Sequence, residues 1–307
     1  MDRIGSNTKS EYELGLAACL GSAVLWGFLP IYWQALRPID SYVIILYRIL
    51  LVAVVCFVVD LKIYGISKII EPLKQKGILL RYLAAGFLIT FNWSLYIWAV
   101  NADFVIQTCI GYYIEPLVVC IFGIVFFSEK ISRYKMIALV FACAGIIILL
   151  LHFGELPLIA IGLSTTFAAY AAIKKSFRME AMLSLFYETI FLAPPALIAI
   201  VYLEINNKGA LGTGEPYQYG LLLLCGIMTA TPLGLFAASA NRLPLITLGL
   251  IEYVSPTITL ILGIFLFKEP FDIVQLMAFV VIWIGLLFFT YGEIKAVKSL
   301  EPEKQPV

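Results

Sequence analysis

Apolar residues occur along the chain in long runs that alternate with short polar stretches. A transmembrane helix needs about 20 apolar residues to cross a hydrocarbon core of about 30 Å, whereas a barrel strand needs about 10. The runs are too long for strands, and a helix satisfies its own backbone hydrogen bonds within lipid. Ten helical spans are therefore predicted, at 14–36, 42–59, 82–100, 105–127, 134–151, 156–173, 183–203, 219–240, 245–267 and 271–290.

The composition agrees with a membrane location. Of the 307 residues, 62% are hydrophobic and 13% are charged, whereas soluble domains have about 25% charged residues. This excludes an ordinary soluble protein and makes the lipid bilayer the first expected partner. The net charge of +1 gives no reason to expect a nucleic-acid partner. The predicted fold class is an all-α polytopic membrane protein.

Lysine and arginine are unevenly distributed over the predicted loops. If the N-terminus is cytoplasmic, 17 of the 21 basic residues lie in inner segments, 3 lie in outer loops, and Arg48 lies within a span. Cytoplasmic loops of membrane proteins carry an excess of basic residues. We therefore expect a multi-pass protein of the plasma or inner membrane with both termini in the cytoplasm.

The sequence contains an internal repeat at an offset of 140 residues. Residues 101–150 and 241–290 share twelve identities in fifty ungapped positions, including Asn101/Asn241, Tyr113/Tyr253, Pro116/Pro256, Gly123/Gly263, Glu129/Glu269 and Gly145/Gly285. The same offset pairs Arg48 with Glu188 and Gly86 with Gly226. Chance similarity between apolar segments is the alternative, but the paired Asn, Pro and Glu disfavour it. Each copy would hold five spans, so the second copy enters the membrane inverted. The two predicted repeats are residues 1–153 and 154–307.

Four ionisable residues lie well inside predicted spans: Arg48, Glu115, Glu188 and Glu252. A charge near the middle of a span costs about 2.5–3.5 kcal/mol on insertion scales, so these side chains should face the bundle interior or a water-filled cavity. We interpret them as the polar core of a substrate pathway. The alternative is that Arg48 and Glu188 pair with one another and only hold the structure together.

The spacing of polar residues supports a cavity. Thr108, Tyr112 and Glu115 follow one face of a helix, and adding 140 gives Leu248, Glu252 and Ser255, again on one face. Two such stripes, related by the repeat, are expected of two inward faces that line one cavity. Ser255 is accordingly included among the candidate cavity walls.

Matched prolines follow these acidic positions. Pro116 and Pro256 each remove a backbone donor and tend to kink a helix. Because paired interruptions in the two halves of a transporter indicate a binding site, we interpret both as hinge candidates. Packing kinks without function are the alternative. Pro30, Pro194, Pro195 and Pro232 are expected to mark further distortions.

Aromatic and amide side chains complete the predicted walls. The candidates are Asn92, Trp93, Tyr96, Tyr112, Tyr113, Tyr187 and Tyr253. For any single aromatic residue, an interfacial or core position is the simpler alternative. Asn92 is more informative, because an amide within a span needs a partner. Lys174 and Lys175 end the sixth span and are expected to anchor it at the cytoplasmic surface.

Enzyme chemistry finds little support in the sequence. His152 is the sole histidine, and the chain has no Walker loop, no H-E-x-x-H motif and no cysteine pair with metal-ligand spacing. We expect no enzyme activity, no cofactor, no metal and no nucleotide-binding domain in this chain. Any active transport would then draw on an ion or solute gradient, with protons carried by an embedded Glu as one option.

The chain resembles the drug/metabolite transporter superfamily, specifically the EamA group, and within it most resembles the RarD proteins, described as chloramphenicol-sensitive proteins. The resemblance covers nearly all of residues 14–290. Its motifs are Trp26-Gly27 with Pro30, Tyr47-Arg48, 92–101, Gly111 to Pro116, Lys174-Lys175, Glu188-Thr189 and 229–270, which includes Arg242-Leu243-Pro244.

This resemblance implies ten helices in two inverted halves and export or exchange of a small metabolite or drug-like solute. It also implies Asn at the position of Glu115 and Gln at that of Glu252, so both departures add acid to the cavity. The added acid favours a cationic solute or proton coupling, whereas Arg48 could hold a carboxylate. A secondary transporter working by alternating access is the main expectation. The alternatives are a passive facilitator or channel on the same fold and a membrane scaffold or sensor without transport.

Overall fold

The computed structural model describes residues 2–74, 76–101, 105–154, 158–177, 180–268 and 271–299. In these ranges the chain forms helices and no strand. The helices of the first part are α1 (Asp2–Ala35), α2 (Ser41–Ile63), α3 (Gly65–Ile70), η1 (Glu71–Lys74), α4 (Lys76–Asn101), α5 (Val105–Phe127) and α6 (Arg133–Phe153). Those of the second are α7 (Leu158–Phe177), α8 (Ala181–Ile190), α9 (Ala193–Ile205), α10 (Ala210–Thr213), α11 (Pro216–Ala240), α12 (Leu245–Glu252), α13 (Val254–Leu262), η2 (Gly263–Phe267) and α14 (Ile273–Ser299).

Local sequence signals set several helix ends. Ser132 accepts a hydrogen bond from the Lys135 backbone N–H at 3.3 Å and so caps the start of α6, which ends at Gly154 with a positive φ of 66°. Glu215 and Gln218 form a capping box at the start of α11. Such caps supply partners for backbone groups that a helix end leaves unpaired.

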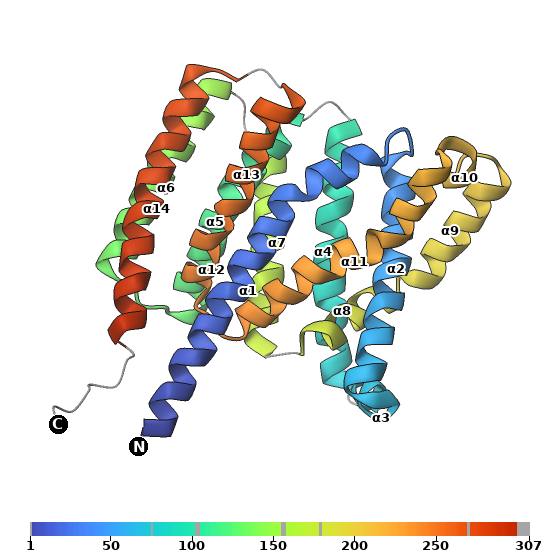
Figure 1. The fold of residues 1–307 in the computed structure, drawn as a ribbon, viewed down its shortest axis with the longest axis horizontal. Coiled ribbons are helices and arrows are strands. Elements are labelled where there is room, and N and C mark those ends of the chain that lie inside the picture. Colours follow the sequence, from blue (N-terminus) through green and yellow to red (C-terminus); the bar gives the residue numbers. More distant parts are fainter. Residues whose placement is uncertain are drawn as a thin grey trace.

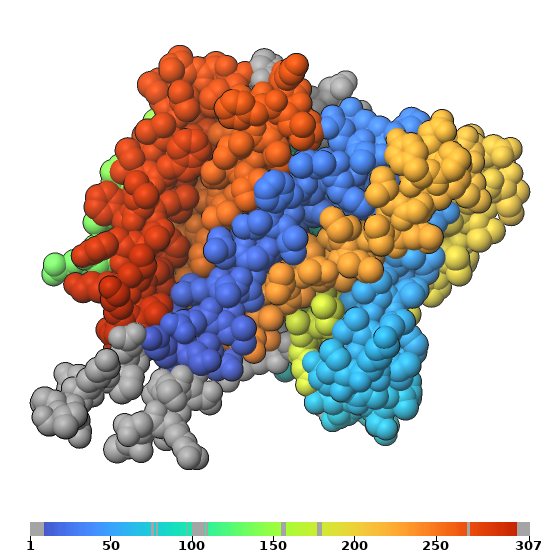
Figure 2. All heavy atoms as spheres, in the orientation of Figure 1, coloured from blue at the N-terminus to red at the C-terminus, as the bar shows by residue number. Residues whose placement is uncertain are grey.

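All ten predicted segments are helical in the described residues, but the count of ten spans is not confirmed. Seven of the described helices are long and apolar enough to cross a membrane. The count rises to nine spans if each of two bent pairs of helices is taken as one span. One such pair is α8 with α9, bent by 54°. Helix α7 is not among these spans, and the lysines of its last turn lower its mean hydropathy. Between α2 and α4, where we expected a surface helix or a basic loop, α3 and η1 project from the bundle (Figure 2).

Helices from the two parts of the chain interleave. α1 lies along α11 and along α12 and α13 (Figures 1 and 2). α5 packs against α7 and α12. α6 and α14 form one long pair, and α2 packs on α8, α9 and α11. Close contacts between consecutive helices of one part, such as α5 and α6, are fewer.

Glycines related by the 140-residue offset lie at related helix crossings. A Cβ atom on Gly86 of α4 would lie 2.5 Å from the Glu188 carbonyl of α8, and one on Gly226 of α11 would lie 2.5 Å from the Leu51 carbonyl of α2. Gly145 and Gly285 likewise lie where α6 and α14 cross, each against the other helix. Only glycine permits these approaches, because any side chain would separate the backbones.

Helices α1 and α7 run in opposite directions. Near the start of α1, Glu11 pairs with Arg242 at 2.8 Å, and near the end of α7, Lys175 donates a hydrogen bond to the adjacent Leu243 carbonyl at 2.6 Å. The start of α1 therefore lies beside the end of α7. The start of α1 and the end of α14 also lie at one end of the bundle (Figure 1); we call it the terminal end.

Candidate functional site

The four ionisable residues singled out in the sequence fall into three separate places. Glu115 and Glu252 come together where α5 and α12 cross. Glu188 lies in a buried network with α7, and Arg48 lies among aromatic rings of α1 and α4. The pairing of Arg48 with Glu188, considered above as an alternative, does not occur in this structure.

Arg48 stacks on tryptophan. Its Cζ lies 3.8 Å from the centroid of the Trp93 ring and 5.3 Å from that of the Trp33 ring. The side chain has partial exposure, but its Nε is buried and has no hydrogen-bond partner. Among the described residues, Tyr32, Tyr112 and Cys225 are the groups that interact with it electrostatically, and none of them is a carboxylate. Stacking provides a cation–π contact but leaves the N–H groups without an anion.

Glu188 instead pairs with Lys174. The prediction that Lys174 lies at the cytoplasmic surface is therefore wrong, because its side chain is buried. The two side chains form an ion pair in which 1% of Lys174 and 0% of Glu188 is exposed. The Ser184 hydroxyl accepts a hydrogen bond from Lys174 Nζ at 2.5 Å and donates one to Glu188 Oε1. The Tyr170 hydroxyl donates a hydrogen bond to Glu188 Oε2 at 3.2 Å. The ammonium lies inside because buried acceptors on α8 replace its water. Nothing in hydropathy revealed this pairing.

Glu115 and Glu252 interact electrostatically at the crossing of α5 and α12. The crossing is close, because a Cβ atom on Gly249 would lie 2.4 Å from the Pro116 carbonyl. Glu252 is 3% exposed, and its Oε1 accepts a weak hydrogen bond from the Cys19 thiol at 3.8 Å. One acid from each of the two polar stripes predicted from the repeat thus interacts with the other at this crossing.

The Asn92 amide has the partner that a buried amide requires. Its Nδ2 donates to the Leu163 carbonyl at 2.7 Å and to Thr166 Oγ1 at 2.9 Å, which joins α4 to α7. Trp93, the next residue along α4, faces Arg48. Asn92 therefore positions the helix that carries the Trp93 ring.

The tyrosines occupy different surroundings. Tyr96 and Tyr112 are partly exposed and lie with ring centroids 5.7 Å apart, near Arg48. Tyr113 packs edge-on against Phe279 at 4.9 Å, and the buried Tyr253 hydroxyl has no hydrogen-bond partner. Tyr187 is buried away from these residues, where its hydroxyl donates to the Ile69 carbonyl and its ring stacks on Tyr82. Ser255 is half-buried near the start of α13.

The matched prolines act differently. Pro116 lies inside the unbroken helix α5, whereas helical structure stops at Tyr253, three residues before Pro256, and resumes in α13. Pro256 has no N–H for the Glu252 carbonyl, which accounts for a break at this position. Pro194 and Pro195 begin α9 after the bend from α8, in agreement with the distortion predicted there.

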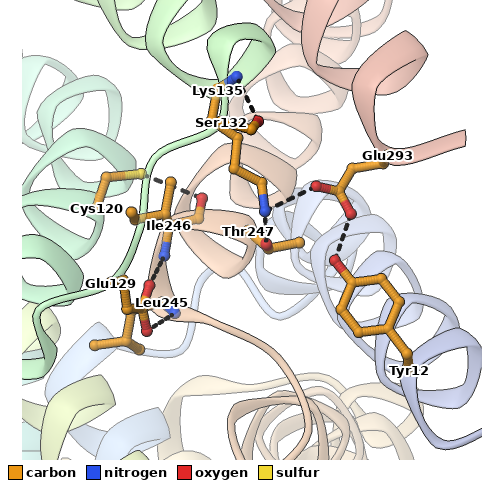
Figure 3. A network of polar contacts seen from close by, with 9 residues as sticks. All are labelled: Tyr12, Cys120, Glu129, Ser132, Lys135, Leu245, Ile246, Thr247 and Glu293. Atoms are coloured by element: carbon orange, nitrogen blue, oxygen red, sulfur yellow. Dashed lines mark hydrogen bonds and ion pairs between the residues drawn. The ribbon is translucent and has the colours of Figure 1, made fainter. Parts of the chain in front are cut away.

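A network of polar contacts joins five helices near the terminal end (Figure 3). Lys135 of α6 lies 2.9 Å from Glu293 Oε1 of α14 and donates to Thr247 Oγ1 of α12 at 2.8 Å. The Tyr12 hydroxyl of α1 donates to Glu293 Oε2 at 2.5 Å. The Cys120 thiol of α5 donates to the Ile246 carbonyl at 3.4 Å.

Glu129, in the connection after α5, caps α12 in the same network. Its carboxylate accepts the backbone N–H groups of Leu245 at 2.7 Å and Ile246 at 2.9 Å, and Lys175 lies 3.5 Å away. A carboxylate at a helix N-terminus satisfies unpaired N–H groups and faces the positive end of the helix dipole. Its repeat partner, Glu269, lies outside the described residues.

The opposite end of the bundle contains a groove of about 450 Å³, which is lined by Ile31, Gln34, Ala35, Leu266 and Phe267. None of the four ionisable residues is among those that line it. His152 at the end of α6 lies 2.8 Å from Asp272, which caps α14. In the part of the chain that the structure describes, no group of three or more His, Cys, Asp or Glu side chains could hold a metal.

Sequence reasoning missed Asp60, near the end of α2. Its side chain is fully buried, and both carboxylate oxygens have no hydrogen-bond partner. Glu180, before α8, interacts with it electrostatically and has one buried, unpaired oxygen of its own. Asp60 follows an apolar run at the boundary of a predicted loop, so hydropathy alone placed it in water.

The chain matches the model of the EamA-like transporter family twice, over residues 13–151 and 156–291. It is 35% identical to an uncharacterized transporter, YojE, of Bacillus subtilis over 93% of this chain and 96% of that protein. It is 30% identical to Protein RarD of Escherichia coli over 91% of this chain and 95% of RarD, and 30% identical to Protein RarD of Streptomyces exfoliatus.

A solved crystal structure shares the fold at a TM-score of 0.72, with 13% sequence identity, over 91% of this chain and 98% of that one. At this identity the likeness concerns the fold alone. The family matches cover both parts of the chain, and the helices are those of a multi-pass membrane protein. The chain therefore belongs to the EamA-like transporter family, in the group that includes the RarD proteins.

Proposed function

We propose that the protein is a secondary transporter that exports or exchanges a small metabolite or drug-like solute by alternating access. The solute would pass between two inverted five-helix repeats, residues 1–153 and 154–307, in a plasma or inner membrane with both termini in the cytoplasm. Family membership supports transport. The basic residues of the inner loops and the position of the first and last helices at one end support the orientation.

The helix arrangement supports two inverted repeats. α1 and α7 correspond under the 140-residue offset and run in opposite directions. The contacts of α1 with α11 and α12 correspond to those of α7 with α4 and α5. Two copies with opposite orientation can exchange conformations, so that the pathway opens first to one side and then to the other.

The single observation that carries the proposal is the crossing of α5 and α12. These helices correspond under the offset, cross at Pro116 and Gly249, and bring Glu115 and Glu252 together inside the bundle. Two carboxyl groups that interact inside a bundle each disfavour the charged form of the other, so binding of a proton or a cation at one of them would be favourable. This supports proton coupling as the energy source.

The polar network supports a conformation that is closed at the terminal end. Tyr12, Lys135, Thr247 and Glu293 connect α1, α6, α12 and α14 there, whereas the groove lies at the opposite end. Opening the terminal end would require these contacts to separate. In alternating access the network would therefore act as the closed gate.

The test uses purified full-length protein in liposomes with a broad mixture of labelled amino acids, amines, organic acids, nucleosides and antibiotics. We expect at least one solute to accumulate above its equilibrium level when a pH gradient is imposed, and to stop doing so when the gradient is dissipated. Equilibration without accumulation would support the passive facilitator. No flux above that of empty liposomes, from folded protein, would support the scaffold.

The role of the acid pair is tested with Glu115→Gln and Glu252→Gln. Each should abolish accumulation driven by the pH gradient while exchange of the same solute across equal pH continues. Glu13→Gln, at the exposed Lys9–Glu13 pair, is the matched control and should behave as the parent protein. Unchanged gradient-driven accumulation in both variants would exclude the pair from coupling.

A further inference from the structure

We propose that Arg48 is the anion-binding site of the solute pathway, and that the solute class is a flat apolar molecule with one carboxylate. This inference rests on the proposed function and names the substrate class that the pathway accepts. It is carried by the surroundings of the guanidinium.

The first observation is an uncompensated charge. Arg48 lies inside the span α2, and its Nε has no hydrogen-bond partner in the described part of the chain. No carboxylate of the described residues is among the groups that interact with it electrostatically. Of the acids inside the spans, Glu188 pairs with Lys174. Glu115 and Glu252 are not among the described groups that interact with Arg48 electrostatically. Arginine stays charged in proteins, and an embedded charge is retained at a high cost. A negatively charged ligand supplies the missing partner.

The second observation is the tryptophan ring beside the guanidinium. The Trp93 ring lies 3.8 Å from Cζ and occupies one side of the group, so a ligand that binds two N–H groups at once must approach along the edge that carries them. The N–H groups of that edge form a fork that matches the two oxygens of a carboxylate. Stacking on tryptophan and bidentate binding at the edge can occur together, which a lysine would not allow.

The third observation is the aromatic surrounding. Trp33 lies on the same guanidinium at 5.3 Å, and the Tyr32 and Trp33 rings meet at 4.8 Å. Tyr112, which interacts with Arg48, lies beside Tyr96, and both rings are partly exposed. Rings around an anion site suit the flat apolar body of the same solute. No lysine or second arginine is among the groups near Arg48 in the described residues, which favours a monoanion over a doubly charged phosphate.

The experiment measures thermal unfolding of the full-length protein in detergent, followed by tryptophan fluorescence. The probes are benzoate, benzyl alcohol and benzylamine at equal concentration and ionic strength. A ligand that binds only the folded state raises the unfolding temperature. We expect benzoate to raise the unfolding temperature by several degrees. The uncharged benzyl alcohol and the cationic benzylamine should raise it little.

Three variants assign the effect. Arg48→Gln should lose the benzoate shift, and Arg48→Lys, which keeps the charge without the fork, should bind benzoate at least tenfold more weakly. Arg242→Gln, at the exposed Arg242–Glu11 pair, is the matched control and should keep the full shift. If Arg48→Gln does not fold, Arg48→Lys still decides between loss and retention.

The inference would be overturned if benzylamine raised the unfolding temperature as much as benzoate does. It would also be overturned if the benzoate shift persisted in Arg48→Lys and Arg48→Gln. Neither result would bear on the proposed transport. Absence of a benzoate shift in the folded parent protein would also overturn the inference. Benzoate binding that depends on Arg48 without benzoate flux in liposomes would support the anion site while counting against transport of this probe.

Discussion

Lys174 and Glu188 form an ion pair inside the helix bundle, with 1% and 0% of their side chains exposed. They come from α7 and α8, and Ser184 and Tyr170 supply the remaining hydrogen bonds of the carboxylate. The pair fixes the last turn of α7 against α8. Because the pair is buried, either charge alone would be left without water and without an opposite charge.

The first prediction follows from this pair. Lys174→Met and Glu188→Leu should each lower the free energy of unfolding by about 3–5 kcal/mol, because each leaves the other charge buried and unpaired. The double variant should lose less than either single variant. Chemical unfolding in detergent measures all three, and a double variant with the sum of the single losses would contradict the prediction.

The second prediction concerns the cap of α12. Glu129→Gln keeps the size of the side chain but removes the carboxylate that accepts hydrogen bonds from the Leu245 and Ile246 N–H groups. It should lower the free energy of unfolding by about 1–2 kcal/mol. Glu13→Gln removes an exposed ion pair and should cost less than about 1 kcal/mol. Equal losses in unfolding measurements would show that the cap contributes no more than a surface pair.

The third prediction uses two helical glycines in contrasting positions. Gly249→Ala would place a Cβ atom 2.4 Å from the Pro116 carbonyl, so it should separate α5 from α12 and lower the unfolding temperature. Gly220→Ala meets no atom within 4 Å and should stabilise α11 by about 0.5–1 kcal/mol through helix propensity. Opposite shifts in thermal unfolding are expected, and a destabilised Gly220→Ala would contradict the argument.

The fourth prediction is a dependence on pH at the end of the bundle opposite to the terminal end. A hydrogen bond from the Gln275 backbone N–H, helped by His152, lowers the pKa of Asp272. The unfolded chain has an aspartate pKa of about 3.9, so this carboxylate stabilises the fold fully above that value and loses its contribution as the pH falls through the folded pKa.

The test compares the parent protein with Asp272→Asn. Between about pH 5 and pH 2 the unfolding temperature of the parent should fall more steeply than that of the variant, since only the parent has this carboxylate to protonate. Parallel curves would show that Asp272 contributes nothing to acid stability.

The sequence predicted helices reliably because a run of apolar residues in lipid has few other ways to satisfy its backbone. The distortion at Pro194 and Pro195 and the break before Pro256 were also predictable, since a missing N–H has a local effect. At Pro116, in contrast, α5 continues without a break. A proline in the sequence therefore does not by itself predict an interrupted helix.

Partners across the bundle were less predictable. Arg48 and Glu188 correspond under the repeat, yet the structure gives Glu188 to Lys174 and leaves Arg48 stacked on Trp93. Hydropathy predicted that Lys174 lies in water, because a hydropathy scale takes no account of the residues that pack beside it in the fold. The same limitation hid Asp60 and the partners of Asn92, which depend on the helices that pack beside them.

The interleaving of the helices bears on how the chain is divided. α1 packs on α11 to α13, and α5 packs on α7 and α12. Each repeat therefore buries much of its surface against the other repeat. Either repeat made alone would expose the crossings of Gly86, Gly145, Gly226 and Gly285 to lipid. We therefore expect that neither repeat folds alone, and that separately expressed halves become ordered only when they bind one another.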